Sequence, residues 1–275
     1  MVEDFKALRV DREGPVLKVC LNSPETGNAI SGLLLDELLS VLNDVQDDPS
    51  VRVLVLSGAG DDFSLGGDRK EFGELLAEDP SGTSLRAVSN KARKLCEALA
   101  TTDAVTIARL HGGVIGAGLA LAVFCDLRAG AENCRFRMPE LALGLPPAWG
   151  GALHRLVSEV GTARVRELLL TGENFDADRA AELTVLHKVV TEKELDDAIN
   201  RWIKPLIRRS PGALRTAKSM MNAYSGAGRL ADATMLDTEL LTSALVAAAV
   251  PRPPAPKPVP EQPRSLRKKF SRSRL

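Results

Sequence analysis

Two apolar segments of this chain run directly into small residues that begin a helix, and this repeated pattern restricts the possible folds most strongly. The first is VRVLVLSGAGDDFSLGGDRKEF (51–72) and the second is TIARLHGGVIGAGLALAVFCD (106–126). A strand with a continuous apolar centre is typical of a parallel sheet that is covered on both faces. Alternation of such strands with helices therefore predicts an α/β core with parallel pairing.

The segments around these strands predict a hairpin and two helices. Residues 6–21 alternate apolar and polar side chains on both sides of Glu13 and Gly14, as two strands joined by a tight turn would. Ser31 is followed by leucine and valine residues at helical spacing, so we expect a helix that Ser31 caps. Another long helix is expected over 85–99, before the second apolar segment.

The sequence between about residues 150 and 250 is mainly helical in its pattern. One short segment, HKVV (187–190), interrupts it as an expected strand. The helices would cover the α/β core or a neighbouring subunit. Their expected ranges are 151–158, 162–171, 176–183, 192–208, 212–223 and 228–248.

The composition is that of a globular protein with reduced cysteines. At 275 residues and 44% hydrophobic content, the chain can bury a large core. The cysteines are widely spaced without a CxxC pair, which favours buried structural thiols at Cys20, Cys96, Cys125 and Cys134. We find no charged-then-apolar leader and no apolar run of the roughly 18 residues that a membrane helix needs. The expected compartment is therefore the cytoplasm, without membrane contact.

Basic charge is concentrated at the end of the chain, although the formal net charge of the whole is zero. Residues 251–275 contain eight lysine or arginine residues and one acid, Glu261. Seven prolines among the first thirteen of these residues predict a disordered spacer. The basic end favours a solvated tail that aids solubility or subunit contact, with nucleic acid as the alternative partner.

The glycine-rich turns suggest a site for negative charge. Glycine tolerates positive φ and leaves room for a ligand beside the backbone, and the second loop contains Gly112, Gly113, Gly116, Ala117 and Gly118. The start of a helix leaves N–H groups without internal partners, where phosphate or a developing oxyanion binds. A tight turn with close packing is the alternative. Dinucleotide binding is disfavoured, because the glycines read GxxGxG and not GxGxxG.

Five segments resemble the crotonase, or enoyl-CoA hydratase/isomerase, superfamily in their order and spacing. They are LNSPETGNAI (21–30), FSLGGDRKEF (63–72), HGGVIGAGLALAVFCDLRAG (111–130), FRMPELALGLPPAWGG (136–151) and LLLTGENFDADRAAELTVLHKVV (168–190), and the likeness extends from about Leu8 to Lys218. The resemblance implies an α/β fold built as a spiral of ββα turns, with a C-terminal helical trimerisation region and assembly into homotrimers or homohexamers. The expected division is a crotonase-like core over 1–195, a helical region over 196–250 and the basic tail over 251–275.

The resemblance also implies a substrate and a set of contacts. The substrate would be an acyl-CoA thioester, so coenzyme A is part of the substrate and no separate cofactor is expected. The backbone N–H groups of Gly67 and Ala117 would bind the thioester oxygen, and Glu140 would move the proton. Further substrate contacts would come from Asp68, Gly116, Trp149 and Leu65, whose carbonyl would hold the adenine.

One of these substrate contacts has a plainer structural alternative, and no metal site is expected beside them. Trp149 is equally well interpreted as core packing. The histidines His111, His154 and His187 lack the spacing of metal ligands, so no metal site is expected.

One catalytic position departs from the hydratases that the chain resembles. They use two glutamates, and the first of these positions is Ala120 here, whereas the second is retained as Glu140. Addition of water is easiest with two positioned groups, but moving a double bond needs one base that removes and returns a proton. The expected function is therefore that of an enoyl-CoA isomerase/hydratase with a single glutamate. Apolar neighbours such as Leu141, Leu145 and Trp149 would raise the pKa of Glu140.

Two other functions are left open by the sequence. Carboxymethylproline synthases, which form a carbon–carbon bond, resemble this chain in the GGD of the first loop, the loss at Ala120 and the MPE motif. A non-catalytic module that binds acyl-CoA or RNA would follow if the basic tail had become the working part. The usual C-terminal segment that contacts CoA is also replaced, which leaves Lys218 or the tail as candidates for phosphate contacts. Acyl chain length and the choice between CoA and a carrier protein stay undetermined.

Overall fold

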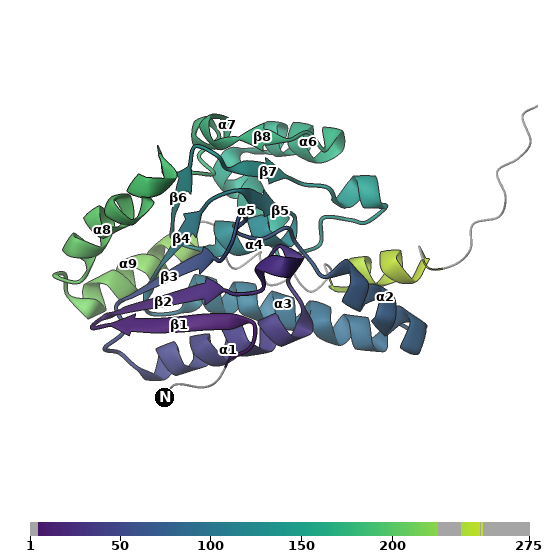
Figure 1. Ribbon diagram of the computed structural model, residues 1–275, viewed down its shortest axis with the longest axis horizontal. Helices are drawn as coiled ribbons and strands as arrows, with labels where there is room; N and C mark the ends of the chain where they lie inside the picture. The colour runs from purple at the N-terminus through teal and green to yellow at the C-terminus, as the bar shows by residue number, and fades with distance from the viewer. Residues whose placement is uncertain (1–4, 225–237, 248, 250–275) are drawn as a thin grey trace, which may run out of the picture.

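Two sheets of different size organise the chain in the computed structural model, which describes residues 5–224, 238–247 and 249 (Figure 1). The larger sheet has the order β1-β2-β3-β4-β6-β9, and every neighbouring pair is parallel except β1 and β2. Its strands are β1 (Leu8–Glu13), β2 (Val16–Leu21), β3 (Val53–Gly58), β4 (Val105–Leu110), β6 (Leu127–Ala131) and β9 (Lys188–Val190). The smaller sheet, of order β5-β7-β8, consists of β5 (Gly113–Ile115), β7 (Arg135–Arg137) and β8 (Phe175–Asp176).

Helices connect these strands and pack on both faces of the larger sheet (Figure 1). They are α1 (Gly32–Asp47), α2 (Arg69–Glu78), α3 (Thr83–Thr101), α4 (Ala117–Phe124), α5 (Ala152–Val160), α6 (Thr162–Thr171), α7 (Ala177–Glu182), α8 (Leu195–Leu206) and α9 (Pro211–Tyr224). A further helical stretch covers 238–247. The parallel α/β class predicted from the apolar strands is confirmed.

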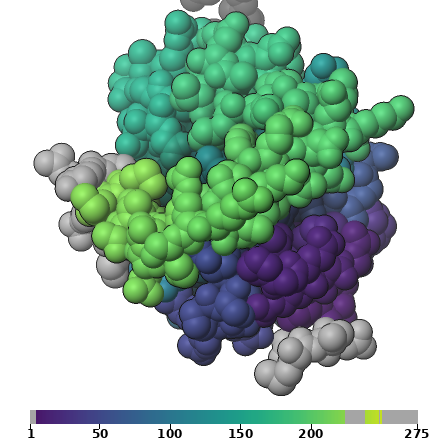
Figure 2. Space-filling view, turned by 90° about the vertical axis from the view of Figure 1, so that its left-hand side faces the viewer, coloured from purple at the N-terminus to yellow at the C-terminus, as the bar shows by residue number. Residues whose placement is uncertain are grey.

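The larger sheet is buried on both faces because successive side chains of a strand point to opposite sides. In β3, Leu54 and Leu56 belong to the main core, which α1, α3 and α4 share. Val53 and Val55, one position away, pack in a second cluster with residues of α8. Figure 2 shows α8 and α9 as a green band across this side of the molecule, next to the purple N-terminal hairpin.

Local signals in the first fifty residues are confirmed by the structure. β1 and β2 form the predicted hairpin, and Gly14 in its turn has a φ of 59°. α1 begins after Ser31, whose hydroxyl oxygen accepts a hydrogen bond of 3.2 Å from the Leu34 N–H. This side chain therefore satisfies one of the free N–H groups at the helix start.

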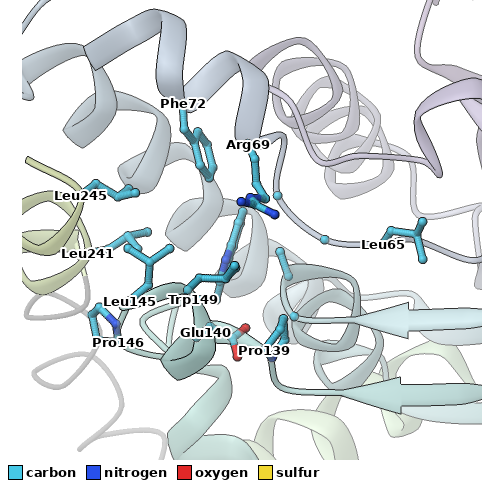
Figure 3. Close-up of a pocket in the computed structure, with 15 residues that line it drawn as sticks. Leu65, Arg69, Phe72, Pro139, Glu140, Leu145, Pro146, Trp149, Leu241 and Leu245 are labelled. Atoms are coloured by element: carbon cyan, nitrogen blue, oxygen red, sulfur yellow. The ribbon is translucent and has the colours of Figure 1, made fainter. Parts of the chain in front are cut away.

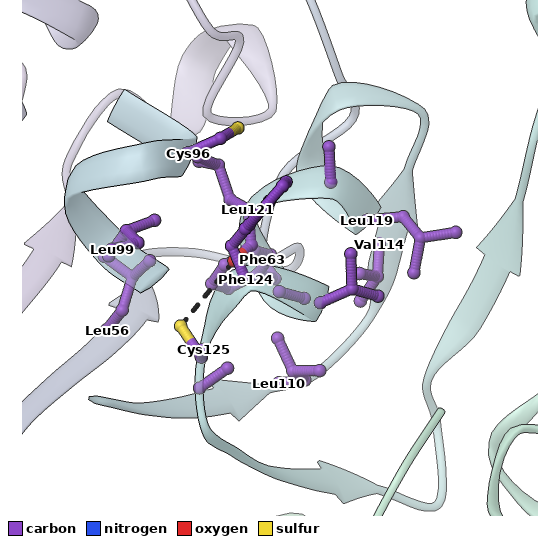
Figure 4. Packing of buried hydrophobic residues seen from close by; sticks show 14 of the residues in the cluster. Leu56, Phe63, Cys96, Leu99, Leu110, Val114, Leu119, Leu121, Phe124 and Cys125 are labelled. Carbon is purple, nitrogen blue, oxygen red and sulfur yellow. Dashed lines mark hydrogen bonds between the residues drawn. The ribbon is translucent and has the colours of Figure 1, made fainter. Parts of the chain in front are cut away.

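α4 is the most deeply buried helix of the main core, since each of its residues is buried. Figure 4 shows Leu121 and Phe124 of this helix packed among side chains from β3, α3 and the first glycine-rich loop. Its small residues permit this close contact: a Cβ atom on Gly118 would lie 2.6 Å from the Ser64 carbonyl oxygen. The packing of α4 thus holds the two glycine-rich loops against each other.

Lys218 does not serve the role expected for it from the sequence. Its side chain is buried, and its Nζ atom lies 2.8 Å from an Asp126 carboxylate oxygen. The same ammonium group donates to the carbonyl oxygens of Ala104 and Leu99 at 3.0 and 3.4 Å. These contacts occupy the Lys218 ammonium group inside the fold and tie α9 to the end of α3. Lys218 is therefore not available to bind a phosphate.

The cysteines match the prediction of reduced structural thiols. Cys20, Cys96, Cys125 and Cys134 are free and buried. Burial raises the pKa of Cys125 and Cys134 to about 12, which keeps these two thiols protonated. No helix in the described part of the chain is long and apolar enough to cross a membrane.

Several sequence predictions concern residues that the structure does not describe. The basic tail over 251–275 and the first part of the helix expected over 228–248 lie outside the described residues. The trimerisation role of the C-terminal helices stays a prediction, as does the division of the chain at residue 195.

Candidate active site

The two glycine-rich loops lie side by side in the structure. The Ser64 N–H donates to the Gly113 carbonyl oxygen at 3.1 Å, and the Ile115 N–H donates back to the Ser64 carbonyl oxygen at 3.0 Å. Beyond this bridge, a Cβ atom on Gly66 would lie only 3.6 Å from the Ala117 nitrogen. Gly66 has a φ of 102°, so both its conformation and its surroundings favour glycine.

Two backbone N–H groups at this junction have no acceptor among the described residues. Ala117 is the first residue of α4, where the N–H groups lack partners within the helix. Gly67 lies between two backbone hydrogen bonds, from the Ile30 N–H to the Gly66 oxygen and from the Asp68 N–H to the Ile30 oxygen. Both Gly67 and Ala117 line one pocket, so their N–H groups are candidates for binding an oxyanion there.

This pocket has a volume of about 200 Å³ and is mostly apolar (Figure 3). Five parts of the chain form it: the two loops, the start of α2, the segment from Pro139 to Trp149, and the helix over 238–247. The lining residues are Leu65, Gly66, Gly67, Arg69, Phe72, Gly116, Ala117, Pro139, Glu140, Leu143, Leu145, Pro146, Trp149, Leu241 and Leu245.

Glu140 is the acid in this pocket, at the start of a 3₁₀ turn over Glu140–Leu143. The residue is 9% exposed, and its Oε2 atom has no hydrogen-bond partner among the described residues. A Cβ atom on Gly116 would lie 3.0 Å from its Oε1 atom, so the carboxylate reaches the second loop directly. Burial raises the pKa of Glu140 above its usual range. An unpaired carboxylate beside two free N–H groups can move a proton at a bound carbonyl compound.

The predicted cause of the raised pKa is right, but one predicted neighbour is wrong. Leu145 and Trp149 line the pocket as expected. Leu141 is 42% exposed and does not line it, whereas Leu143 does. The short 3₁₀ turn turns Leu141 outward, which spacing in the sequence alone did not indicate.

The other predicted site residues divide into two groups. Leu65, Gly116 and Trp149 line the pocket, and the Trp149 ring lies 3.2 Å from the position of a Cβ atom on Gly67, which favours its interpretation as a pocket wall. Asp68 is not among the lining residues. Its carboxylate caps α2 by accepting from the N–H groups of Lys70 and Glu71, at 3.0 Å each. A direct contact of Asp68 with substrate stays a prediction.

Two positions from the sequence analysis are structural in this fold. Ala120 is buried in the main core and does not line the pocket. Its methyl side chain supplies no acid, and no other described residue supplies an acid at that place in the pocket. His111 is also buried, and its Nε2 atom lies 2.8 Å from the Gly60 carbonyl oxygen. Among the described residues that line the pocket, Glu140 is thus the only titratable acid.

Sequence reasoning missed eight of the pocket residues, namely Gly66, Arg69, Phe72, Pro139, Leu143, Pro146, Leu241 and Leu245. Phe72 could have been found, since it lies one helical turn after the first loop. Leu241 and Leu245 belong to an apolar face with helical spacing, but nothing local shows that this face returns to residues far away in the sequence.

Glutamine in place of Glu140 should change how stability depends on pH. A carboxyl whose pKa is raised by folding binds its proton more tightly in the folded state, so it favours folding below the ordinary glutamate pKa. That advantage is lost as the pH rises through the raised pKa. Glu140→Gln should therefore gain unfolding free energy relative to the parent as the pH rises from the ordinary glutamate pKa through the raised one. Urea unfolding at several pH values measures this difference, and a constant difference would contradict a buried, titrating Glu140.

Comparison with known proteins agrees with this geometry. The sequence profile of the enoyl-CoA hydratase/isomerase family matches residues 11–250. The short-chain-enoyl-CoA hydratase of Clostridium acetobutylicum is 30% identical over 214 residues, which are 78% of this chain and 80% of the relative. The 2,3-dehydroadipyl-CoA hydratase of Escherichia coli is 33% identical over 216 residues, or 78% and 81% of the two chains.

A solved structure extends the comparison to the fold. The enoyl-CoA hydratase of Bacillus halodurans has a TM-score of 0.82 over 87% of this chain and 95% of that one, at 22% identity. The crotonase-like fold expected from the motifs is therefore confirmed. By its sequence match over most of its length, the chain belongs to the enoyl-CoA hydratase/isomerase family, the crotonase superfamily.

Proposed function

We propose that this chain moves a double bond in an enoyl-CoA thioester, with Glu140 as its single proton-transferring group. The N–H groups of Gly67 and Ala117 would hold the thioester oxygen. The observation that carries the proposal is the buried, unpaired Oε2 atom of Glu140 in the pocket that these two donors share. The position where hydratases that the chain resembles have a second glutamate is Ala120, inside the core.

The proposed reaction needs one base and one oxyanion site. The Glu140 carboxylate removes a proton from carbon 2 of a 3-enoyl thioester, and the electron pair shifts onto the thioester oxygen. Donors aimed at this oxygen stabilise the enolate more than the substrate, which lowers the barrier. The protonated Glu140 then returns the proton to carbon 4, and the product is the 2-enoyl thioester. The raised pKa suits this role, because it makes the carboxylate a stronger base.

Solvent exchange distinguishes this reaction from hydration. A 3-enoyl-CoA thioester incubated with the protein in deuterium oxide should yield the 2-enoyl product, with deuterium at carbon 4 whenever Glu140 exchanges its proton. Mass spectrometry and NMR measure product and label. Rapid hydration of a 2-enoyl thioester without isomerisation of the 3-enoyl one would contradict a single-base isomerase. Decarboxylation of a malonyl thioester would instead favour the carbon–carbon bond-forming alternative.

A further inference from the structure

The pocket contains one cationic side chain that the proposed reaction does not use. Among the described lining residues, Arg69 is the only cation, and most of the other side chains are apolar. Figure 3 shows Arg69 of α2 and Glu140 of the 3₁₀ turn entering the pocket from different elements. Arg69 is itself exposed, so its guanidinium lines the pocket while staying in contact with water. An apolar acyl chain would form no polar contact with this group.

Arg69 has no partner of opposite charge within the described part of the chain. The two acids nearest in the sequence are already engaged. Asp68 caps α2 through the N–H groups of the next turn, and the Glu71 carboxylate accepts from the Gly32 N–H at 2.8 Å. Arg69 is not among the groups that shift the pKa of Glu140, which responds mainly to burial. The guanidinium is therefore free to bind a ligand.

The chemistry of this group selects a particular kind of ligand. Arginine stays charged at all relevant pH values and presents its N–H donors in a planar fork that matches a carboxylate. Arg69 is also the first residue of α2, where the helix dipole favours an anion. Because Arg69 lines the same pocket as Glu140 and the two free N–H groups, the anion belongs to the acyl part of the substrate, beyond the carbons that react at Glu140.

We infer that Arg69 binds a carboxylate at the far end of the substrate's acyl chain, so that this enzyme acts on the thioester of a dicarboxylic acid. The inference rests on the proposed function for the position of the thioester. The phosphates of coenzyme A are the competing source of negative charge. Arg69 would then be a specificity residue, since a neutral chain of the same length leaves it unpaired.

Paired substrates and a matched control test the inference. The substrates are two enoyl thioesters of equal chain length, one ending in a methyl group and one in a carboxylate, each as the CoA and the N-acetylcysteamine thioester. Arg69→Gln should lower kcat/KM for the carboxylate substrate by about ten- to a hundred-fold, the usual effect of losing a charged hydrogen-bonding partner. Turnover of the methyl substrate should be unchanged or higher. The loss should be the same for both carriers, because the N-acetylcysteamine thioester has no phosphates.

Lys70 provides the control, because Lys70→Gln removes the same charge one residue away. The Lys70 side chain is strongly exposed, and its Nζ atom lies 3.7 Å from the Glu74 Oε1 atom. Lys70 does not line the pocket, so Lys70→Gln should leave kcat/KM unchanged for both substrates. Arg69→Lys should recover only part of the lost activity, since an ammonium cannot form the two parallel hydrogen bonds of a guanidinium.

Several outcomes would overturn the inference. An equal loss for both acyl chains in Arg69→Gln would make Arg69 a general part of the site, and a loss confined to CoA thioesters would assign it to the phosphates. If the parent turned over neither substrate, the proposed function would fail separately. Calorimetric binding of the saturated thioesters would then decide about Arg69, with tighter binding of the carboxylate form, lost in Arg69→Gln, as the supporting result.

Discussion

Replacement of Glu140 by glutamine should lower kcat for an enoyl thioester by about 10²–10⁴-fold, the usual contribution of a positioned acid or base. Glutamine keeps the shape of the side chain but cannot take up and return a proton. The loss should be close to complete for catalysed exchange, because no other acid lines the pocket among the described residues. Ala120 is a core residue and offers no replacement.

The control for this variant is a glutamate far from any proposed chemistry. Glu173 is exposed and does not line the pocket, so Glu173→Gln removes one acid without touching the site. Circular dichroism and the binding of a saturated acyl-CoA should match the parent for both variants, whereas turnover should fall for Glu140→Gln alone. Near-parental turnover by a folded Glu140→Gln protein would exclude Glu140 as the base and require another group.

The sequence predicts the larger sheet well because its strands are long enough to show a pattern. β3 has a continuous apolar centre and β4 a mainly apolar one, and both strands are largely buried. The short strands β5, β7 and β8 have two or three residues each, too few to show any alternation. Tertiary packing accompanies their pairing: β5 contacts α4, and β7 and β8 contact α7, with Phe136 stacked on Phe175. A sequence pattern therefore predicts the larger sheet but not the smaller one, although β5 and β7 of the smaller sheet lead into Ala117 and Glu140.

Some residues of the candidate site could be predicted from the sequence, whereas others are recognised only once the folded pocket is known. Gly67 and Ala117 were assigned as oxyanion donors through the resemblance, and the small residues after each strand supported a site for negative charge there. The structure places both residues in one pocket, and their role as donors stays a prediction. Glu140 followed from the resemblance, and its burial followed from apolar neighbours, although Leu141 was wrongly included. Arg69 gave no local signal, since one arginine after a cap looks like any exposed charge at a helix start. Its meaning depends on the pocket formed around it.

Proline in place of Ala117 should remove one oxyanion donor while leaving α4 intact. Ala117 is the first residue of this helix, where proline is well tolerated because the N–H has no partner within the helix. Gly116 before it has φ 50° and ψ −113°, the mirror image of the extended conformation that a residue before proline prefers. Because glycine has no side chain, it can keep these angles. We expect the unfolding midpoint of Ala117→Pro to stay near that of the parent.

The catalytic effect of the same change should be large. Loss of one oxyanion donor lowers kcat by about 10²–10³-fold, and the proline ring also occupies space where the thioester oxygen would bind. Ala117→Gly is the matched control, because it keeps the N–H and should stay within about tenfold of the parent. Free coenzyme A, which has no acyl oxygen, should bind all three proteins equally in calorimetry. If Ala117→Pro folds and turns over substrate at the parental rate, this N–H does not hold the oxyanion. The donor would then have to be sought among the other N–H groups of the two loops.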